Sequence, residues 1–253
     1  MMSAGIDAGA ATIKAVLLID GKVTGSIVRP TGFDFSAAAL QIYDDLLRQT
    51  GTEKAAVGAI GATGYGRDSI SFATKRISEI TAHAQGVYHL YPEVRGIIDI
   101  GGQDSKIIVV NDGKVVDFLM NDRCAAGTGK FLEHTARALE LTVEDLGQIA
   151  LSSKSPASIN SMCTVFAESE VISLRAKGFS REDIAAGLVE SIARRVAVMA
   201  RQKGLYQDIA LVGGVAKNAG IRVALEKELG VGLFVPPEPQ ITGAIGASLI
   251  AMR

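Results

Sequence analysis

An aspartate followed two residues later by a glycine occurs twice in the chain, at Asp7–Gly9 and at Asp99–Gly101, each time directly after an apolar segment. This spacing directs a carboxylate and the free N–H groups of a tight turn at one point. Backbone N–H groups bind phosphate oxygens, and a carboxylate binds a hard divalent cation. The two turns therefore predict that the chain binds a phosphorylated ligand that carries a divalent cation.

The two turns belong to a longer repeat. Residues 6–23 (IDAGAATIKAVLLIDGKV) align without gaps with residues 98–115 (IDIGGQDSKIIVVNDGKV), and eight of the eighteen positions are identical. Each copy predicts three strands, joined first by the glycine turn and then by an Asp-Gly pair, which favours a two-residue hairpin. Because 253 residues are enough for two domains, the repeat predicts two similar domains that grip one ligand.

The segments around the repeat alternate between helical and extended patterns. In the first predicted helix, Leu40, Tyr43, Leu46 and Leu47 share a face that we expect to be buried. Apolar runs at 55–60 and 209–212 predict strands. The predicted helices are 35–50, 77–90, 131–141, 164–177, 184–203 and 243–252. The predicted domains are residues 1–90 with 236–253, and residues 91–235.

A third glycine turn, Gly213-Gly214, follows the strand at 209–212, and Asn218 lies near the start of the next helix. A turn of this kind lets the backbone approach a ligand closely. Two other glycine segments fit known motifs poorly. Residues 127–130 precede Phe131 where a P-loop needs Ser or Thr, and residues 61–66 have the wrong order for a dinucleotide fingerprint.

The two cysteines, Cys124 and Cys163, each stand before a predicted helix. A helix N-terminus lowers the pKa of a thiol and makes it a better metal ligand. Two thiols are too few for a [4Fe–4S] cluster, which takes four, but a two-fold dimer would supply the missing pair. The alternatives are a zinc site that includes His134 and a pair of inert, buried thiols.

The bulk composition excludes several classes of protein. The net charge of −1 gives no reason to expect nucleic-acid binding. No apolar run approaches the ~20 residues that cross a bilayer, and the N-terminus lacks the basic start of a signal peptide. We therefore expect a cytoplasmic protein that does not enter a membrane.

The three glycine turns resemble the phosphate-1, phosphate-2 and adenosine motifs of the actin, Hsp70 and sugar-kinase superfamily. This resemblance implies an α/β fold of two ribonuclease-H-like domains with ATP or ADP in the interdomain cleft. It places Mg²⁺ near Asp7 and Asp99 and gives Gln103 or Asp104 the catalytic task of orienting water. The residues that it assigns to the nucleotide are Gly9, Ala10, Ala11, Thr12, Ile13, Lys14, Gly101, Gly102, Gly213, Gly214, Asn218 and Gln240.

Some neighbouring residues have simpler interpretations. Relatives usually carry Ser or Thr where this chain has Ala10-Ala11, which leaves fewer hydroxyl contacts to phosphate. Lys14 and Lys106 occupy matching places in the repeat and are interpreted as structural. The three histidines are interpreted as non-catalytic. Glu168 and Glu170 are expected to be solvated or to form salt bridges.

The segments around Cys124 (NDRCAAGTGKFLE) and Cys163 (INSMCTVFAESEVIS) resemble those of the ATP-dependent activators of 2-hydroxyacyl-CoA dehydratases, in the BadF/BadG/BcrA/BcrD ATPase family. The resemblance implies a homodimer that holds one [4Fe–4S] cluster through Cys124 and Cys163 of both chains. It further implies an ATPase that takes one electron from reduced ferredoxin or flavodoxin and passes it to a 2-hydroxyacyl-CoA dehydratase.

Three alternative functions remain. An ATPase subunit of a benzoyl-CoA reductase would differ only in its partner enzyme. A small-molecule kinase of the same superfamily would hydrolyse ATP in response to a sugar and contain no iron. A nucleotide-gated scaffold would polymerise and keep both cysteines free. The cysteine segments favour the activator, because kinases of this superfamily have no use for them.

Overall fold

The computed structural model describes residues 1–161 and 163–253. Its internal contacts form two compact units. The first unit comprises Met1–Ile97, Ile108–Asp117 and Pro236–Arg253, and the second comprises Ile98–Ile107 and Phe118–Val235. The domain bounds expected from the sequence stay predictions.

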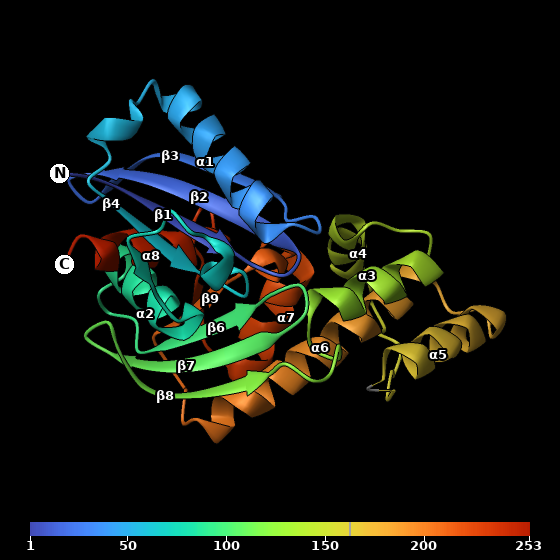
Figure 1. Cartoon of the computed structure of the whole chain (residues 1–253). Helices are drawn as coiled ribbons and strands as arrows, with labels where there is room; N and C mark the ends of the chain where they lie inside the picture. Colours follow the sequence, from blue (N-terminus) through green and yellow to red (C-terminus); the bar gives the residue numbers. More distant parts are fainter. Residues whose placement is uncertain (162) are drawn as a thin grey trace. The chain divides into compact units, whose positions relative to one another are not determined.

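The first unit is built on a five-stranded sheet of order β3-β2-β1-β4-β5 (Figure 1). Its strands are β1 (Met2–Ala8), β2 (Thr12–Ile19), β3 (Lys22–Pro30), β4 (Ala59–Thr63) and β5 (Lys75–Arg76). The first three strands pair antiparallel, as the repeat predicts, whereas β4 pairs parallel to β1. Both β1 and β4 therefore end at the same edge of the sheet.

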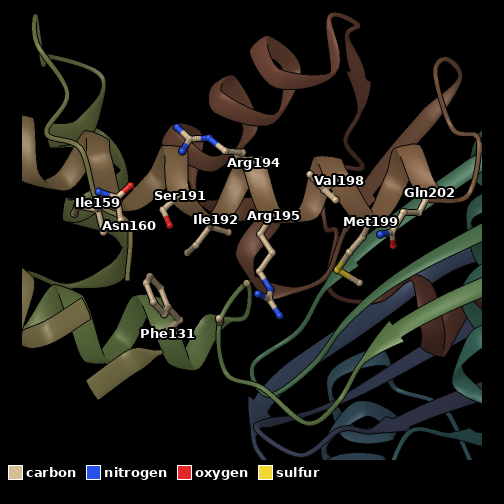
Figure 2. Close-up of a pocket in the computed structure, with 12 residues that line it drawn as sticks. Phe131, Ile159, Asn160, Ser191, Ile192, Arg194, Arg195, Val198, Met199 and Gln202 are labelled. Carbon is tan, nitrogen blue, oxygen red and sulfur yellow. The ribbon is translucent and has the colours of Figure 1, made fainter. Parts of the chain in front are cut away.

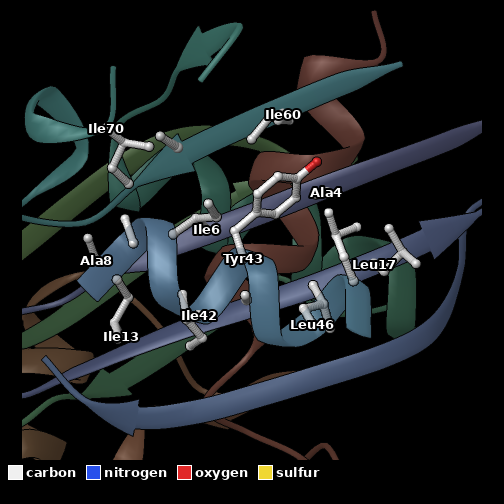
Figure 3. Close-up of a cluster of buried hydrophobic side chains, with 14 residues drawn as sticks. Ala4, Ile6, Ala8, Ile13, Leu17, Ile42, Tyr43, Leu46, Ile60 and Ile70 are labelled. Carbon is white, nitrogen blue, oxygen red and sulfur yellow. The ribbon is translucent and has the colours of Figure 1, made fainter. Parts of the chain in front are cut away.

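Helices cover both faces of this sheet, which explains why β2 is apolar on both sides from Ala15 to Ile19. On one face, Ile13 and Leu17 pack with Ile42, Tyr43 and Leu46 of α1 (Phe35–Thr50), as Figure 3 shows. On the other face, the alternate residues of β2 pack with α8 (Thr242–Ala251); this second cluster comprises Val16, Leu18, Ile241, Ala244 and Ile245. Helix α2 (Glu79–Leu90) packs along α8.

The second sheet has the order β10-β9-β6-β7-β8. Its strands are β6 (Gly96–Ile100), β7 (Ser105–Asn111), β8 (Lys114–Asn121), β9 (Ile209–Val212) and β10 (Leu233–Phe234). The helices of the second unit are α3 (Gly129–Ala138), α4 (Val143–Ala150), α5 (Thr164–Ala176), α6 (Arg181–Gln202) and α7 (Ala219–Leu229). Helix α6 contacts both α4 and α7, and α3 contacts α5.

Several expectations are confirmed at the level of elements. Helix α1 and strand β9 have the predicted bounds. At both Asp-Gly pairs the aspartate and the glycine have positive φ, with values of 49° and 78° at Asp20-Gly21 and 48° and 72° at Asp112-Gly113. These are the backbone angles that a two-residue hairpin requires.

Other expectations are wrong. Leu40 is 45% exposed, because the buried face of α1 contains Ala39 and Ile42 instead. The segment predicted as a strand at 55–60 begins as a short 3₁₀ turn, and the strand runs over Ala59–Thr63. Helix α4 and the short strands β5 and β10 have no counterpart among the predictions. In the described part of the chain, no helix is both long and apolar enough to cross a membrane.

Candidate functional site

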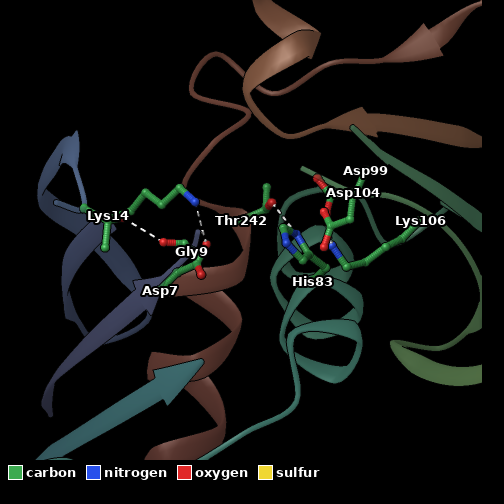
Figure 4. Close-up of polar contacts among 9 residues, drawn as sticks. Asp7, Gly9, Lys14, His83, Asp99, Asp104, Lys106 and Thr242 are labelled. Atoms are coloured by element: carbon green, nitrogen blue, oxygen red, sulfur yellow. Dashed lines mark hydrogen bonds and ion pairs between the residues drawn. The ribbon is translucent and has the colours of Figure 1, made fainter. Parts of the chain in front are cut away.

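The first acidic turn, which contains Asp7 and Gly9, lies at the end of β1, where the chain turns back into β2. Asp7 is buried at the end of β1, directly opposite Lys14 of β2 in the antiparallel register. The Lys14 Nζ lies 3.1 Å from Asp7 Oδ2, and the two groups form an ion pair (Figure 4). The Thr31 hydroxyl donates to the Gly9 carbonyl at 2.7 Å and holds the turn from the other side. Side chains from β2 and from the residue after β3 therefore hold the turn in place.

The second acidic turn repeats this arrangement with an additional carboxylate. Lys106 of β7 is 2% exposed, and its Nζ lies 3.3 Å from Asp99 Oδ2 and 2.8 Å from Asp104 Oδ1 (Figure 4). The seven-residue spacing from aspartate to lysine thus produces the same ion pair in both units. The interpretation of Lys14 and Lys106 as purely structural missed this contact with the acidic turns.

A glycine with positive φ packs against each aspartate. A Cβ on Gly64, at the end of β4, would lie 2.5 Å from Asp7 Oδ1, and a Cβ on Gly213, at the end of β9, would lie 2.4 Å from Asp99 Oδ1. Their φ angles are 86° and 88°. Gly64, within residues 61–66, therefore packs against the first acidic turn, just as Gly213 packs against the second. This contact, and not a dinucleotide motif, accounts for the glycine at this position. The common signal is a glycine directly after the strand.

Two further groups lie beside Asp7. The buried His83 ring places Nδ1 2.9 Å from the Thr242 hydroxyl at the start of α8. A Cβ on Gly243 would lie 3.2 Å from His83 Nε2 and 3.3 Å from Asp7 Oδ2. The N-terminal end of α8 and His83 therefore border the first acidic turn. No sequence pattern indicates this contact, because residues 83 and 243 meet only through the packing of α2 on α8.

The remaining predicted residues differ in exposure. Ala11, Gln103 and Gly214 are exposed and can meet a ligand, whereas Ile13 and Gly213 are buried; the partly exposed residues are Gly9, Ala10, Thr12, Gly101, Gly102 and Gln240. The side chain of Asn218 has structural partners: its Oδ1 caps α7 by accepting from Ile221 N at 3.0 Å, and its Nδ2 donates to Val143 O at 2.7 Å. Asn218 therefore fixes the start of α7 directly after the Gly213-Gly214 turn.

The structure agrees with the interpretation that residues 127–130 do not form a P-loop. The Gly129 and Lys130 N–H groups donate to the carbonyls of Gly101 and Gly102, at 2.9 and 2.8 Å. The Lys130 ammonium pairs with Glu133 at 2.7 Å on the surface. The first N–H groups of α3 thus hold the second acidic turn, and a phosphate would have to compete with these bonds.

The two cysteines are exposed and free. Cys163 is the N-cap residue of α5, as expected, but Cys124 lies in a loop four residues ahead of the Thr128 N-cap of α3, so its predicted place at a helix N-terminus is wrong. Among the residues that the structure describes, no group of three or more His, Cys, Asp or Glu side chains could hold a metal ion. Exposed thiols suit soft metal ligation, but one chain offers only two.

A groove of about 380 Å³ borders both cysteine loops (Figure 2). Its walls include Ala126-Gly127, which follow Cys124, and Ile159-Asn160, which precede Cys163. Phe131 of α3 and the side of α6 that carries Ile192 and Arg195 complete it. Sequence patterns do not indicate this groove, since its walls come from three separate segments.

Comparison with known proteins identifies the family. The model of the BadF/BadG/BcrA/BcrD ATPase family matches residues 4–251, which is nearly the whole chain. This chain belongs to the BadF/BadG/BcrA/BcrD ATPase family. Within it, the chain is 46% identical to the activator of lactoyl-CoA dehydratase from Anaerotignum propionicum, over 99% of this chain and 97% of that protein. It is 32% identical to one of the subunits of benzoyl-CoA reductase from Thauera aromatica, over 98% and 92%.

Solved structures of family members agree closely with this chain. Component A of (R)-2-hydroxyglutaryl-CoA dehydratase from Acidaminococcus fermentans has a TM-score of 0.96 at 42% identity, covering 99% of this chain and 97% of that one. The activator of 2-hydroxyisocaproyl-CoA dehydratase from Clostridium difficile, solved with bound ADPNP, has a TM-score of 0.93 at 42% identity, covering 99% and 94%.

A more distant structure extends the comparison beyond the family. A ROK family glucokinase from Streptomyces griseus, with a TM-score of 0.63 at 13% identity over 100% and 99% of the two chains, shares the fold alone. The α/β fold predicted from the superfamily motifs is thereby confirmed, as is the resemblance to the dehydratase activators.

Proposed function

We propose that the protein is an ATP-hydrolysing iron–sulfur protein that reductively activates a 2-hydroxyacyl-CoA dehydratase by transfer of one electron. The observation that carries the proposal is the presence, in one ATPase-family chain, of two acidic phosphate-type turns together with two exposed thiols. Three relatives with 42–46% identity are named as activators of such dehydratases.

The acidic turns supply the groups that MgATP needs. The Asp7 and Asp99 carboxylates are hard oxygen ligands of the kind that Mg²⁺ binds, directly or through water. Two buried hydroxyls support a polar ligand here: Thr63 Oγ1 and Ser105 Oγ have no hydrogen-bond partner among the described residues. Thr63 pairs with Asp7 in the parallel register of β1 and β4, and Ser105 directly follows Asp104. The residues therefore fit a magnesium–phosphate group.

In this proposal the backbone N–H groups of residues 9–12 and of Gly102 and Gln103 hold phosphate oxygens, and Gly213-Gly214 faces the nucleotide. The Gly101 N–H instead closes the turn, since it donates to the Asp104 carbonyl at 3.0 Å. Gln103, which is exposed, and Asp104, which Lys106 holds in place, are the candidates to orient the attacking water. The water oxygen forms a bond to the γ-phosphorus as the bond to the ADP oxygen breaks, which yields ADP and phosphate. Preorganised groups of this kind act by positioning and by charge.

The thiols fit a shared iron–sulfur cluster. A [4Fe–4S] cluster takes four cysteine ligands, so Cys124 and Cys163 of two chains would complete one set in a homodimer. Cys124 and Cys163 would hold this cluster, which would supply one-electron transfer from reduced ferredoxin or flavodoxin to the dehydratase. A dehydratase is a better-supported partner than a benzoyl-CoA reductase, because the activators are 42–46% identical to this chain and the reductase subunit is 32% identical.

Anaerobic purification with iron and sulfide analysis, followed by electron paramagnetic resonance after dithionite reduction, tests the proposal. We expect about four irons per dimer. The signal should be lost in Cys124→Ala and in Cys163→Ser, and wild-type protein should reduce a 2-hydroxyacyl-CoA dehydratase only with MgATP. An iron-free protein whose ATP hydrolysis survives both substitutions would instead assign the chain to the kinase or scaffold class.

A further inference from the structure

Both cysteine loops lie at the surface, where packing alone does little to hold them. Cys124 and Cys163 are themselves exposed, as are their neighbours Asp122, Arg123 and Val165. An ordered loop in such a place needs polar contacts to offset the entropy of its backbone, about 1–2 kcal/mol per residue. In each loop one side chain binds two backbone groups.

The Cys163 loop is held by Glu170. This carboxylate accepts the N–H of Ser161 at 2.9 Å and the N–H of Asn160 at 3.2 and 3.3 Å to its two oxygens. Glu170 lies seven residues after Cys163, two turns along α5, and therefore on the same side of the helix. Its contacts return to the two residues that stand three and two places before Cys163. The helix that begins at Cys163 thus also holds Asn160 and Ser161 of the preceding loop.

The charge of Glu170 is consistent with this contact. Burial alone would raise the pKa of Glu170, but the hydrogen bonds from Ser161 and Asn160, together with nearby Lys177, outweigh burial and hold the pKa below its usual value. Glu170 therefore accepts these bonds as a carboxylate, and charge-assisted hydrogen bonds are the stronger kind. The expectation that Glu170 is solvated or pairs with a cation is incomplete, because its main partners are backbone N–H groups.

The Cys124 loop is held by Asn121 in a complementary way. The Asn121 Nδ2 donates to the Cys124 carbonyl at 2.9 Å and to the Ala126 carbonyl at 3.0 Å. Asn121 is the last residue of β8, so it anchors the loop to the edge of the second sheet. The Glu170 carboxylate accepts from two backbone N–H groups of the Cys163 loop, and the Asn121 amide donates to two backbone carbonyls of the Cys124 loop. Each side chain matches the backbone groups that its loop presents.

We propose that Glu170 and Asn121 are positioning residues that preorganise Cys163 and Cys124 as ligands of the iron–sulfur cluster. This inference rests on the proposed function, since it deepens the account of the same site. Groups behind metal ligands orient them, and removing such a group typically costs about 10- to 100-fold in metal affinity. Neither residue touches the metal; each acts through the backbone of one cysteine loop.

Cysteine reactivity in the iron-free protein tests the two contacts separately. Glu170→Ala should speed alkylation of Cys163 and leave Cys124 at the wild-type rate, whereas Asn121→Ala should do the reverse, as followed by mass spectrometry of the labelled peptides. Glu168→Ala is the matched control on α5, because the nearest partner of Glu168 is His134 at 3.6 Å. Equal changes at both cysteines, or no change, would overturn the inference. Glu170→Gln replaces the alanine variant if that variant does not fold.

Iron release to a chelator, measured on the anaerobically prepared holoprotein, gives the second readout. We expect iron loss about 10- to 100-fold faster in Glu170→Ala and Asn121→Ala than in the wild type, and unchanged loss in Glu168→Ala. Loss at the wild-type rate in both variants would overturn the inference and leave the proposed function in place. A wild-type protein without iron would overturn the proposed function itself, and the inference with it.

Discussion

Lys106 partly neutralises the two buried carboxylates of the second acidic turn. Its side chain is 2% exposed, and its ammonium lies 3.3 Å from Asp99 Oδ2 and 2.8 Å from Asp104 Oδ1. The matching Lys14 faces Asp7 and is more accessible, with 14% of its side chain exposed. Buried carboxylates without a cation are unfavourable, because the protein interior solvates charge poorly. Lys106 therefore permits two buried acids, Asp99 and Asp104, to lie together in the second acidic turn.

Removing this cation should destabilise the fold strongly. Lys106→Met replaces the aliphatic part of the side chain, removes the ammonium and leaves both carboxylates buried. We therefore expect a loss of about 3–5 kcal/mol in the free energy of unfolding, as measured by urea denaturation. Lys130→Met is the matched control, because the Lys130–Glu133 pair is solvent-exposed and should contribute only about 0–1 kcal/mol. Equal losses in the two variants would show that the buried cation is not needed for stability.

At the scale of elements, each acidic turn is made from two strand ends and one glycine. The strand that carries the aspartate, β1 or β6, supplies the turn, and the glycine after β4 or β9 closes against the carboxylate. A side chain at either glycine would collide with an aspartate oxygen and with the backbone of the next residue, Ala8 or Ile100. The position of each carboxylate therefore depends on a neighbouring strand.

Gly64→Ala and Gly213→Ala should each displace an aspartate and lower ATP turnover, by about 100-fold if the carboxylate moves by about 1 Å. Both also place a Cβ at positive φ, which costs about 1–2 kcal/mol. Gly178→Ala separates the two effects, since Gly178 has a φ of 82° and nothing within 4 Å of its Cβ position. The Gly178→Ala variant should lose a similar amount of folding free energy, about 1–2 kcal/mol, and keep its steady-state ATPase activity. Wild-type turnover in Gly64→Ala would contradict a role for this turn.

The sequence predicted the features that depend on neighbouring residues. The Asp-Gly hairpins, helix α1 and the N-cap position of Cys163 follow from local patterns. The contact of Gly64 with Asp7 requires the parallel pairing of β1 with β4, and sequence alone does not specify that pairing. The contact of Glu170 with the chain before Cys163 depends on how a loop returns to its own helix, and was missed for the same reason.

At the scale of the molecule, the acidic turn occurs once in each unit, whereas cysteines occur in only one of the two units. The duplicated turns arise from one repeat, which gives each unit its own Asp–Lys pair. The thiols are two in number, Cys124 and Cys163, and both belong to the second unit. Symmetry between two copies of the chain is the simplest source of a four-thiol set. Iron binding should then be a property of the dimer.

Mixed dimers distinguish a shared cluster from a metal held by each chain alone. When wild-type chains and Cys163→Ser chains are co-expressed equally and pair at random, about a quarter of the dimers keep all four thiols, so iron should fall to about a quarter of the wild-type content. Independent sites would instead retain about half. The measurement is iron per protein across a series of mixing ratios, with mass spectrometry to give the fraction of variant chains. A linear decline would exclude the shared cluster, whereas a decline with the square of the wild-type fraction requires it.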